Sequence, residues 1–145
     1  MIKNSLRVFV DGVVERKRIG IEDVRELSRE ILPDGIVSRE EADVLVALDR
    51  ALSDVDAAFA DYLVASLVEF AVWTARPTGY VDQDTARWLE TSLGCGTGPT
   101  PTAMRAAFEV VKEAQRVDEA LLGFVMRHAK HRLDAEDRVV PGLAA

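Results

Sequence analysis

The chain has a single cysteine, Cys95, among its 145 residues. One thiol excludes an intramolecular disulfide and any zinc site made of several cysteines, and it suits a reducing compartment. We therefore expect a cytoplasmic protein. Lys and Arg are too few to balance the acids, so the formal net charge is -7. Because nucleic-acid binding depends on clustered Lys and Arg, we expect no nucleic-acid partner.

Aromatic residues are scarce, at 6%, whereas apolar residues as a group reach 48% and charged residues 30%. This composition is typical of a soluble globular chain, and the length is sufficient for one domain with its own core. The stretch from Ala57 to Ala75 is nearly all apolar, yet it contains Asp61 and Glu69. Because an acid is costly in hydrocarbon, we expect a core helix with these acids on its solvent face, and no membrane span.

A short pattern occurs twice, 44 positions apart, at residues 34–45 and 78–89. Each copy has a Gly, two apolar residues, a helix-capping residue (Ser38 or Asp82), and then Ala and Leu at helical spacing. A left-handed Gly is typical of the position after a helix, and Ser or Asp is typical of the start of the next one. The pattern predicts two helix-loop-helix corners.

Apolar residues recur at helical spacing from Ile21 to about Arg132. The sequence predicts an all-α, single-domain bundle of about six helices over residues 21–132, with a C-terminal tail over residues 133–145. For the fifth and sixth helices, the predicted buried residues are Met104, Ala107, Phe108, Val111, Leu121, Leu122 and Val125.

Residues 1–20 allow two interpretations. Asp11-Gly12 between β-rich flanks predicts a β-hairpin, whereas the unbroken apolar run fits an irregular or helical arm that leads into the first helix. An isolated hairpin is only marginally stable, so it would have to pack on the body or on a second chain. A homodimer through residues 1–20 is therefore an open alternative.

The first corner has the outline of an EF-hand calcium loop. If Gly35 takes the invariant glycine position, Asp34, Ser38 and Glu41 fall on ligand positions, with Glu41 at the bidentate one. Leu32, however, falls on a ligand position and has no oxygen to offer, and the loop supplies about half of the oxygens that calcium needs. Asp34, Ser38 and Glu41 are thus the candidate metal ligands. The alternative is that they build a turn and a helix cap without an ion.

Two aromatic residues and an arginine gather around the second corner: Arg76, Tyr80 and Trp88. Aromatic residues at a corner usually close one end of a core. An exposed Tyr and Trp beside an Arg would instead be typical of a protein-binding hot spot. These three are the candidate interaction residues.

The two corners, with Asp-Gly-Ile-Val-Ser-x-x-Glu followed by a long apolar helix, resemble the helical domain of the TerB-like tellurite-resistance family over about residues 20–92. The resemblance implies an all-α bacterial domain linked to stress response, metal ions and protein association near the membrane. It maps the acidic metal clusters of that family at most onto Asp34 and Glu41, and the second copy keeps Asp82 and Asp84.

No catalytic residues are predicted, and the sequence indicates no cofactor other than a divalent cation at the first corner. We expect a non-catalytic protein-interaction or scaffold module. The alternative is a divalent-metal-binding stress-response domain that uses the Asp34–Glu41 corner.

Overall fold

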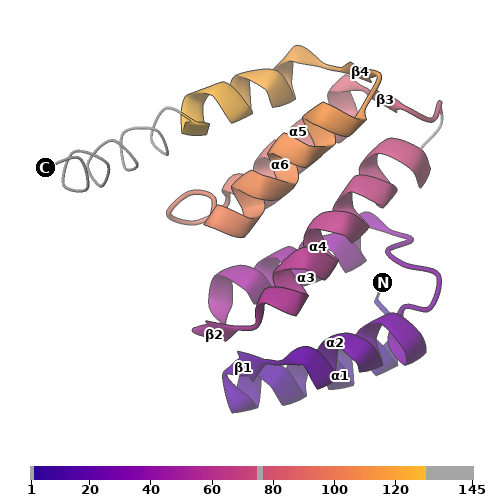
Figure 1. Cartoon of the computed structure of the whole chain (residues 1–145), viewed down its shortest axis with the longest axis vertical. Coiled ribbons are helices and arrows are strands. Elements are labelled where there is room, and N and C mark those ends of the chain that lie inside the picture. Colours follow the sequence, from indigo (N-terminus) through magenta and orange to yellow (C-terminus); the bar gives the residue numbers. More distant parts are fainter. Residues whose placement is uncertain (1, 75–76, 130–145) are drawn as a thin grey trace, which may run out of the picture.

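The computed structural model describes residues 2–74 and 77–129, and over these residues the chain is mostly helical (Figure 1). In chain order the elements are α1 (Asn4–Arg16), β1 (Arg18–Ile19), α2 (Ile21–Glu26), η1 (Leu27–Ile31), α3 (Arg39–Ala51), β2 (Asp54–Val55), α4 (Ala57–Val68), η2 (Glu69–Thr74), β3 (Tyr80–Val81), α5 (Gln83–Gly94), α6 (Pro101–Glu113) and β4 (Arg116–Val117). A further helix occupies residues 119–129. The π-helical turns η1 and η2 continue α2 and α4. The predicted all-α fold is confirmed.

Two pairs of very short parallel strands tie the helices together. The paired residues are Arg18 with Asp54, Ile19 with Val55, Tyr80 with Arg116, and Val81 with Val117. Each pair is extended by one more hydrogen bond, from Asp56 N–H to the Ile19 carbonyl (3.0 Å) and from Asp118 N–H to the Val81 carbonyl (2.8 Å). One offset of 62 positions relates every residue of the first pair to its counterpart in the second.

The same offset relates the helices. α3 spans Arg39–Ala51 and α6 spans Pro101–Glu113, which is the same range moved by 62 positions. α2 with η1 corresponds to α5 in this way, and α4 corresponds to the helix of residues 119–129. The caps agree too, since Ser38 and Thr100 each accept a hydrogen bond from the backbone N–H three residues on. The fold therefore consists of two copies of one β-α-α-β-α unit.

One long helix belongs to both units. α4 ends the first unit, and its continuation through η2 leads into β3 as α1 leads into β1. By the same offset, buried Phe9 of α1 corresponds to buried Ala71 of η2. The buried side chains of both units join in one core, in which α4 packs most extensively against α6.

The combined helix Ala57–Thr74 is long and apolar enough to cross a membrane by length and composition alone. In this fold its Phe59, Leu63 and Leu67 side chains are buried in the core. Its acids lie on the exposed side, as expected, and Asp61 pairs with Arg105 of α6 at 2.8 Å.

The hairpin alternative for the N-terminal residues is wrong, and the helical alternative is observed. α1 runs through Gly12 without a break, and its Leu6, Phe9 and Val13 side chains are buried. Their i, i+3, i+7 spacing places them on one helical face. Burial of that face in the common core outweighs the local turn preference of Asp-Gly, so this segment is part of the bundle.

Two residues that were predicted to be buried, Phe108 and Leu122, are exposed. α6 turns its alanine-rich face inward, and the buried residues there are Ala103, Met104, Ala106, Ala107 and Val110. Short alanine side chains let two helices approach closely, which favours this face in the contact with α4. Leu122 follows buried Leu121 and lies about 100° around the helix from it, on the outer side.

Both predicted corners are confirmed in their local geometry. Gly35 and Gly79 have positive φ values of 78° and 81°, which are readily accessible only to glycine. Ser38 and Asp82 are the N-caps of α3 and α5. The corners are not equivalent in the repeat, however, because the 62-residue offset matches Asp82 with Gly20. The 44-residue spacing thus reflects similar corner chemistry, and the 62-residue offset reflects the architecture.

The substitution Gly12→Ala distinguishes the helix from a hairpin experimentally. An added Cβ would meet only the Arg16 guanidinium, at 3.5 Å. We expect the free energy of unfolding to rise by about 0.5–1 kcal/mol, because alanine favours a helix interior over glycine. Urea denaturation measures this change. A type I′ hairpin turn needs positive φ at this position, so a loss of stability would contradict the helical assignment.

Candidate functional site

The predicted metal residues lie at the first corner, where two of them serve the helix cap. Glu41 N–H donates to Ser38 Oγ (3.2 Å), and Glu41 Oε1 accepts a hydrogen bond from Val37 N–H (2.9 Å). Glu41 is only 3% exposed, whereas Asp34 lies exposed in the turn. Among the described residues, no three or more His, Cys, Asp or Glu gather to hold an ion. The cap by Ser38 and Glu41 is observed, and metal binding stays a prediction.

Tyr62 of α4 forms a second polar feature near this corner. Its hydroxyl is buried and finds no hydrogen-bond partner in the part of the chain that the structure describes. Burial is the largest cause and raises the pKa of Tyr62. The nearby Ser66 hydroxyl, one turn along but outside hydrogen-bond geometry, opposes this rise, and the charge of Glu41 adds to it. The net effect is a raised pKa, so the phenol is neutral at physiological pH.

Trp88, a predicted interaction residue, is engaged inside the protein. Its indole N–H donates to Asp43 Oδ1 (2.9 Å), the Arg39 guanidinium lies 5.3 Å from the ring centroid, and the Phe70 ring meets it edge-on at 5.6 Å. Arg39 also pairs with Asp84 at 2.8 Å. These contacts join α3 to α5, so a partner would meet only the remaining part of the half-buried Trp88 ring.

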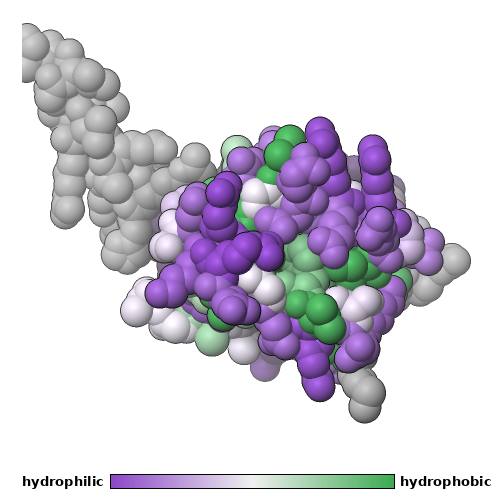
Figure 2. Space-filling view, turned by 90° about the horizontal axis from the view of Figure 1, so that it is seen from below, coloured by the Kyte–Doolittle hydropathy of each residue, from purple (hydrophilic) through white to green (hydrophobic). Residues whose placement is uncertain are grey.

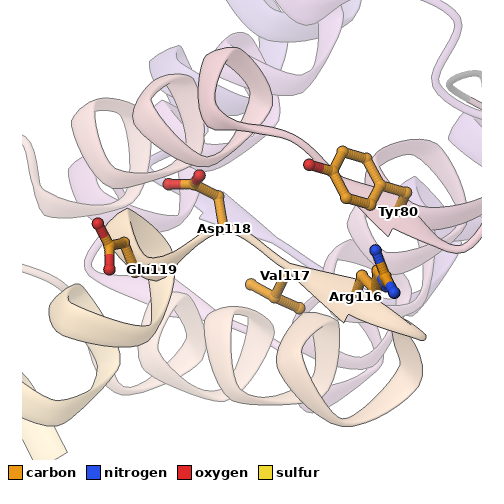
Figure 3. A pocket seen from close by; sticks show the side chains of 5 residues that line it. All are labelled: Tyr80, Arg116, Val117, Asp118 and Glu119. Atoms are coloured by element: carbon orange, nitrogen blue, oxygen red, sulfur yellow. The ribbon is translucent and has the colours of Figure 1, made fainter.

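Tyr80, a second predicted interaction residue, lies at the edge of an open hollow beside the β3–β4 pair. The hollow has a volume of about 500 Å³ and is lined by Tyr80, Arg116, Val117, Asp118 and Glu119. Figure 3 shows Tyr80 and Arg116 at one end, the two carboxylates at the other, and Val117 between them. Tyr80 is 38% exposed. Arg76, the third predicted interaction residue, lies outside the described residues.

Of the three charged side chains in the hollow, only that of Asp118 has a hydrogen-bond partner among the described residues. Arg116 and Glu119 form no ion pair with any described residue. Asp118 caps the helix of residues 119–129, where its Oδ2 accepts a hydrogen bond from Ala120 N–H (3.0 Å). A guanidinium and a carboxylate, both exposed, thus face the solvent at opposite ends of one hollow.

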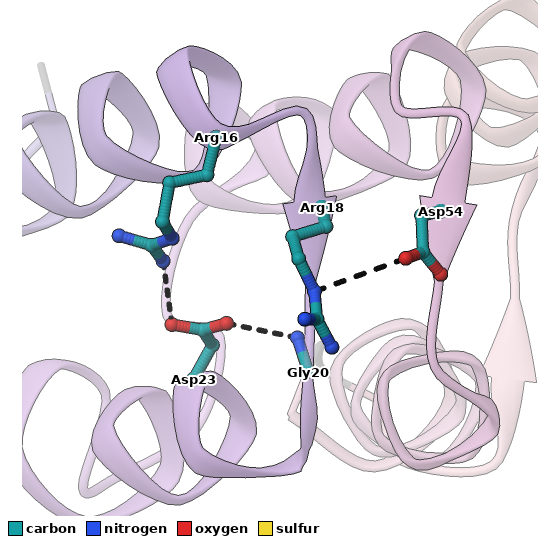
Figure 4. A network of polar contacts seen from close by, with 5 residues as sticks. All are labelled: Arg16, Arg18, Gly20, Asp23 and Asp54. Atoms are coloured by element: carbon teal, nitrogen blue, oxygen red, sulfur yellow. Dashed lines mark hydrogen bonds and ion pairs between the residues drawn. The ribbon is translucent and has the colours of Figure 1, made fainter.

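The corresponding place in the first unit holds an exposed ion pair. Arg18 and Asp54 occupy the positions of Tyr80 and Arg116, and Arg18 Nε lies 3.8 Å from Asp54 Oδ2 (Figure 4). Asp23 adds a second bridge there, since it accepts hydrogen bonds from Arg16 (2.7 Å) and from Gly20 N–H (2.8 Å).

Sequence reasoning missed Arg116, although a signal for it exists. Asp54-Val55-Asp56 and Arg116-Val117-Asp118 share the pattern x-Val-Asp ahead of a helix, 62 positions apart. The shared Val and Asp build the strand and the cap in both units. The position that differs, Asp54 against Arg116, is the one that changes the charge of the site.

A second surface lies on the outer side of α1 and α2. Seen from that side, apolar side chains gather near the middle of the face and hydrophilic ones surround them (Figure 2). The exposed apolar residues of these two helices are Val8, Val14 and Ile21. A homodimer through residues 1–20 stays a prediction.

Comparisons of the chain with protein-family models, with curated proteins and with solved structures give no match.

Substitution of Glu41 tests both interpretations of the first corner. Because the buried carboxylate accepts the Val37 N–H, Glu41→Ala should lower the free energy of unfolding by about 1–3 kcal/mol in the absence of any metal. Urea denaturation in EDTA measures this loss. If saturating Ca²⁺, Mg²⁺, Mn²⁺ or Zn²⁺ then raises the melting temperature of the wild type but not of Glu41→Ala, the metal interpretation holds.

The cap of the second corner predicts a pH effect. The Thr85 N–H, which donates to Asp82 Oδ1 (2.9 Å), is the main reason that the pKa of Asp82 is lowered below 3.8. A lowered folded pKa contributes stability above pH 3.8, and this contribution is lost as the pH falls through the folded value. Asn caps a helix as well as Asp does but does not titrate.

We therefore expect Asp82→Asn to match the wild type near pH 7 and to lose less stability in acid. Melting temperatures measured from pH 7 down to about pH 2 compare the two proteins. Asp11→Asn, at an exposed acid of α1 that forms no ion pair with any described residue, is the control. Parallel curves for wild type and Asp82→Asn would contradict the assigned role of this carboxylate.

Proposed function

We propose that this chain is a non-catalytic protein-interaction module of TerB-like type that binds a partner protein at the β3–β4 hollow. The observation that carries the proposal is the joint exposure of Tyr80 and Arg116 in one depression of the surface. Tyr and Arg are enriched at the energetic centres of protein interfaces, because each combines a large contact area with directed polar groups.

Comparison of the two units supports this choice of surface. Arg18 and Asp54 lie 3.8 Å apart in the first unit as an exposed ion pair, so each charge has a partner of opposite sign within the chain. Their counterparts Tyr80 and Arg116 leave a phenol and a guanidinium available to another molecule. Arg116 forms no ion pair with any described residue, so its guanidinium can form a charge-assisted hydrogen bond to a ligand without first breaking an ion pair within the chain.

The test is affinity capture from a lysate of the source organism with three forms of the protein. Wild type is compared with Tyr80→Ala/Arg116→Ala, and with Arg18→Ala/Asp54→Ala as the matched control in the other unit. All four residues are exposed, so each double variant should change stability little. We expect a partner that the wild type and the control retain and that the hollow variant loses by about tenfold or more.

A captured protein is then purified and its affinity for the three forms is measured by calorimetry. Equal affinities would place the interface elsewhere and contradict the role of the hollow. Equal losses in both double variants would point to a general surface effect and would contradict it as well.

A further inference from the structure

We infer that the β3–β4 hollow recognises an extended peptide segment of a partner protein in which an acidic and a basic side chain lie two positions apart. The inference rests on the proposed function and specifies the ligand of the same site. It follows from the order in which the charges line the hollow.

The two charges have the spacing of an extended chain. Arg116 and Asp118 are two positions apart in β4 and its continuation, which corresponds to about 7 Å along a strand. Val117 lies between them in the lining of the hollow. An extended ligand repeats the same spacing, so the side chains of its residues i and i+2 can face the two charged ends, while the side chain of residue i+1 points away from the hollow.

The charge signs select the ligand. At one end, the Arg116 guanidinium suits a carboxylate, and the Tyr80 hydroxyl, which points toward the middle of the hollow, can donate a further hydrogen bond to the ligand. At the other end, the Glu119 carboxylate and the remaining capacity of Asp118 suit a lysine or arginine. The chain as a whole carries a net charge of -7, which attracts any cationic peptide. Preference for a neutral, bipolar peptide over a cationic one is therefore specific to the hollow.

Comparison with the first unit explains why we assign peptide recognition to the second strand pair and not to the first. Arg18 with Asp54 already provides one cation and one carboxylate across the strand pair. The replacement of Asp54 by Arg116 and of Arg18 by Tyr80 removes that internal pair. A ligand that brings its own carboxylate restores the missing partner.

The test is a titration followed by heteronuclear NMR of the isotope-labelled full chain. The probes are short capped peptides with the central sequences Glu-Val-Lys, Lys-Val-Lys and Gln-Val-Gln. We expect saturable shifts of the backbone signals of Tyr80 and of residues 116–119 with Glu-Val-Lys, at a Kd of about 0.1–1 mM that is typical of so small a contact. Lys-Val-Lys and Gln-Val-Gln should bind about tenfold more weakly.

Two variants localise the effect. Tyr80→Arg/Arg116→Asp installs the Arg–Asp ion pair of the first unit and should weaken the binding of Glu-Val-Lys by about tenfold or more. Arg18→Ala/Asp54→Ala should leave this binding unchanged. Arg116→Glu should reverse the preference, so that Lys-Val-Lys becomes the tighter probe. This reversal is a gain of affinity for Lys-Val-Lys, which an unfolded variant could not show. The dispersion of the NMR spectrum reports the folding of each variant directly.

Three outcomes would overturn the inference. One is tighter binding of Lys-Val-Lys than of Glu-Val-Lys to the wild type. Another is undiminished binding of Glu-Val-Lys to the Tyr80→Arg/Arg116→Asp variant. The third is concentration-dependent self-association that Arg116→Glu abolishes, which would make a second copy of the chain the occupant. A captured partner that depends on Tyr80 and Arg116, together with failure of all peptides, would retain the proposed function and reject only this ligand.

Discussion

The two short strand pairs are the constraint on which the arrangement of the helices depends. A turn between helices that lies against a core must pair its backbone N–H and carbonyl groups, because unpaired buried groups are costly. Here the turn after α1 is paired with the turn after α3, and the turn before α5 with the turn after α6. Each pair fixes four helix ends at one point. Ile19 and Val81, one from each pair, are buried, so each junction also belongs to the core.

The two junctions share a backbone and differ in their side chains. Val55 and Val117 occupy equivalent positions, and Asp56 and Asp118 cap equivalent helices. The outward-facing residues follow no such rule, since an ion pair spans one junction and a tyrosine with an arginine flanks the other. Positions that the fold needs are therefore kept in both copies, and positions that meet the solvent have changed. We regard this contrast as the reason to place the interaction surface at the second junction.

Much of the helical architecture was predictable, because it depends on local chemistry. Ser38, Asp82 and Thr100 cap helices as their side chains predict, and Gly35 and Gly79 have the predicted left-handed conformation. The strand pairs were not predictable from pattern, since strands of two residues have no periodicity and form only through contacts 36 positions apart. Arg116 was not predicted as a site residue, because its correspondence to Asp54 follows only from these strand pairs. The Asp-Gly pair of α1 left two interpretations open, and the helix forms because burial of Leu6 and Val13 outweighs a local turn preference.

The helix that runs from Ala57 to Thr74 is the last helix of one unit and the first of the next. The two copies consequently have no linker at which they could part, and a break in this helix would disrupt the cores of both. Such a shared element makes unfolding cooperative over the whole body, even though the chain is built as a tandem repeat. Destabilising either strand junction should therefore lower the stability of the whole body in one transition, and not that of one copy alone.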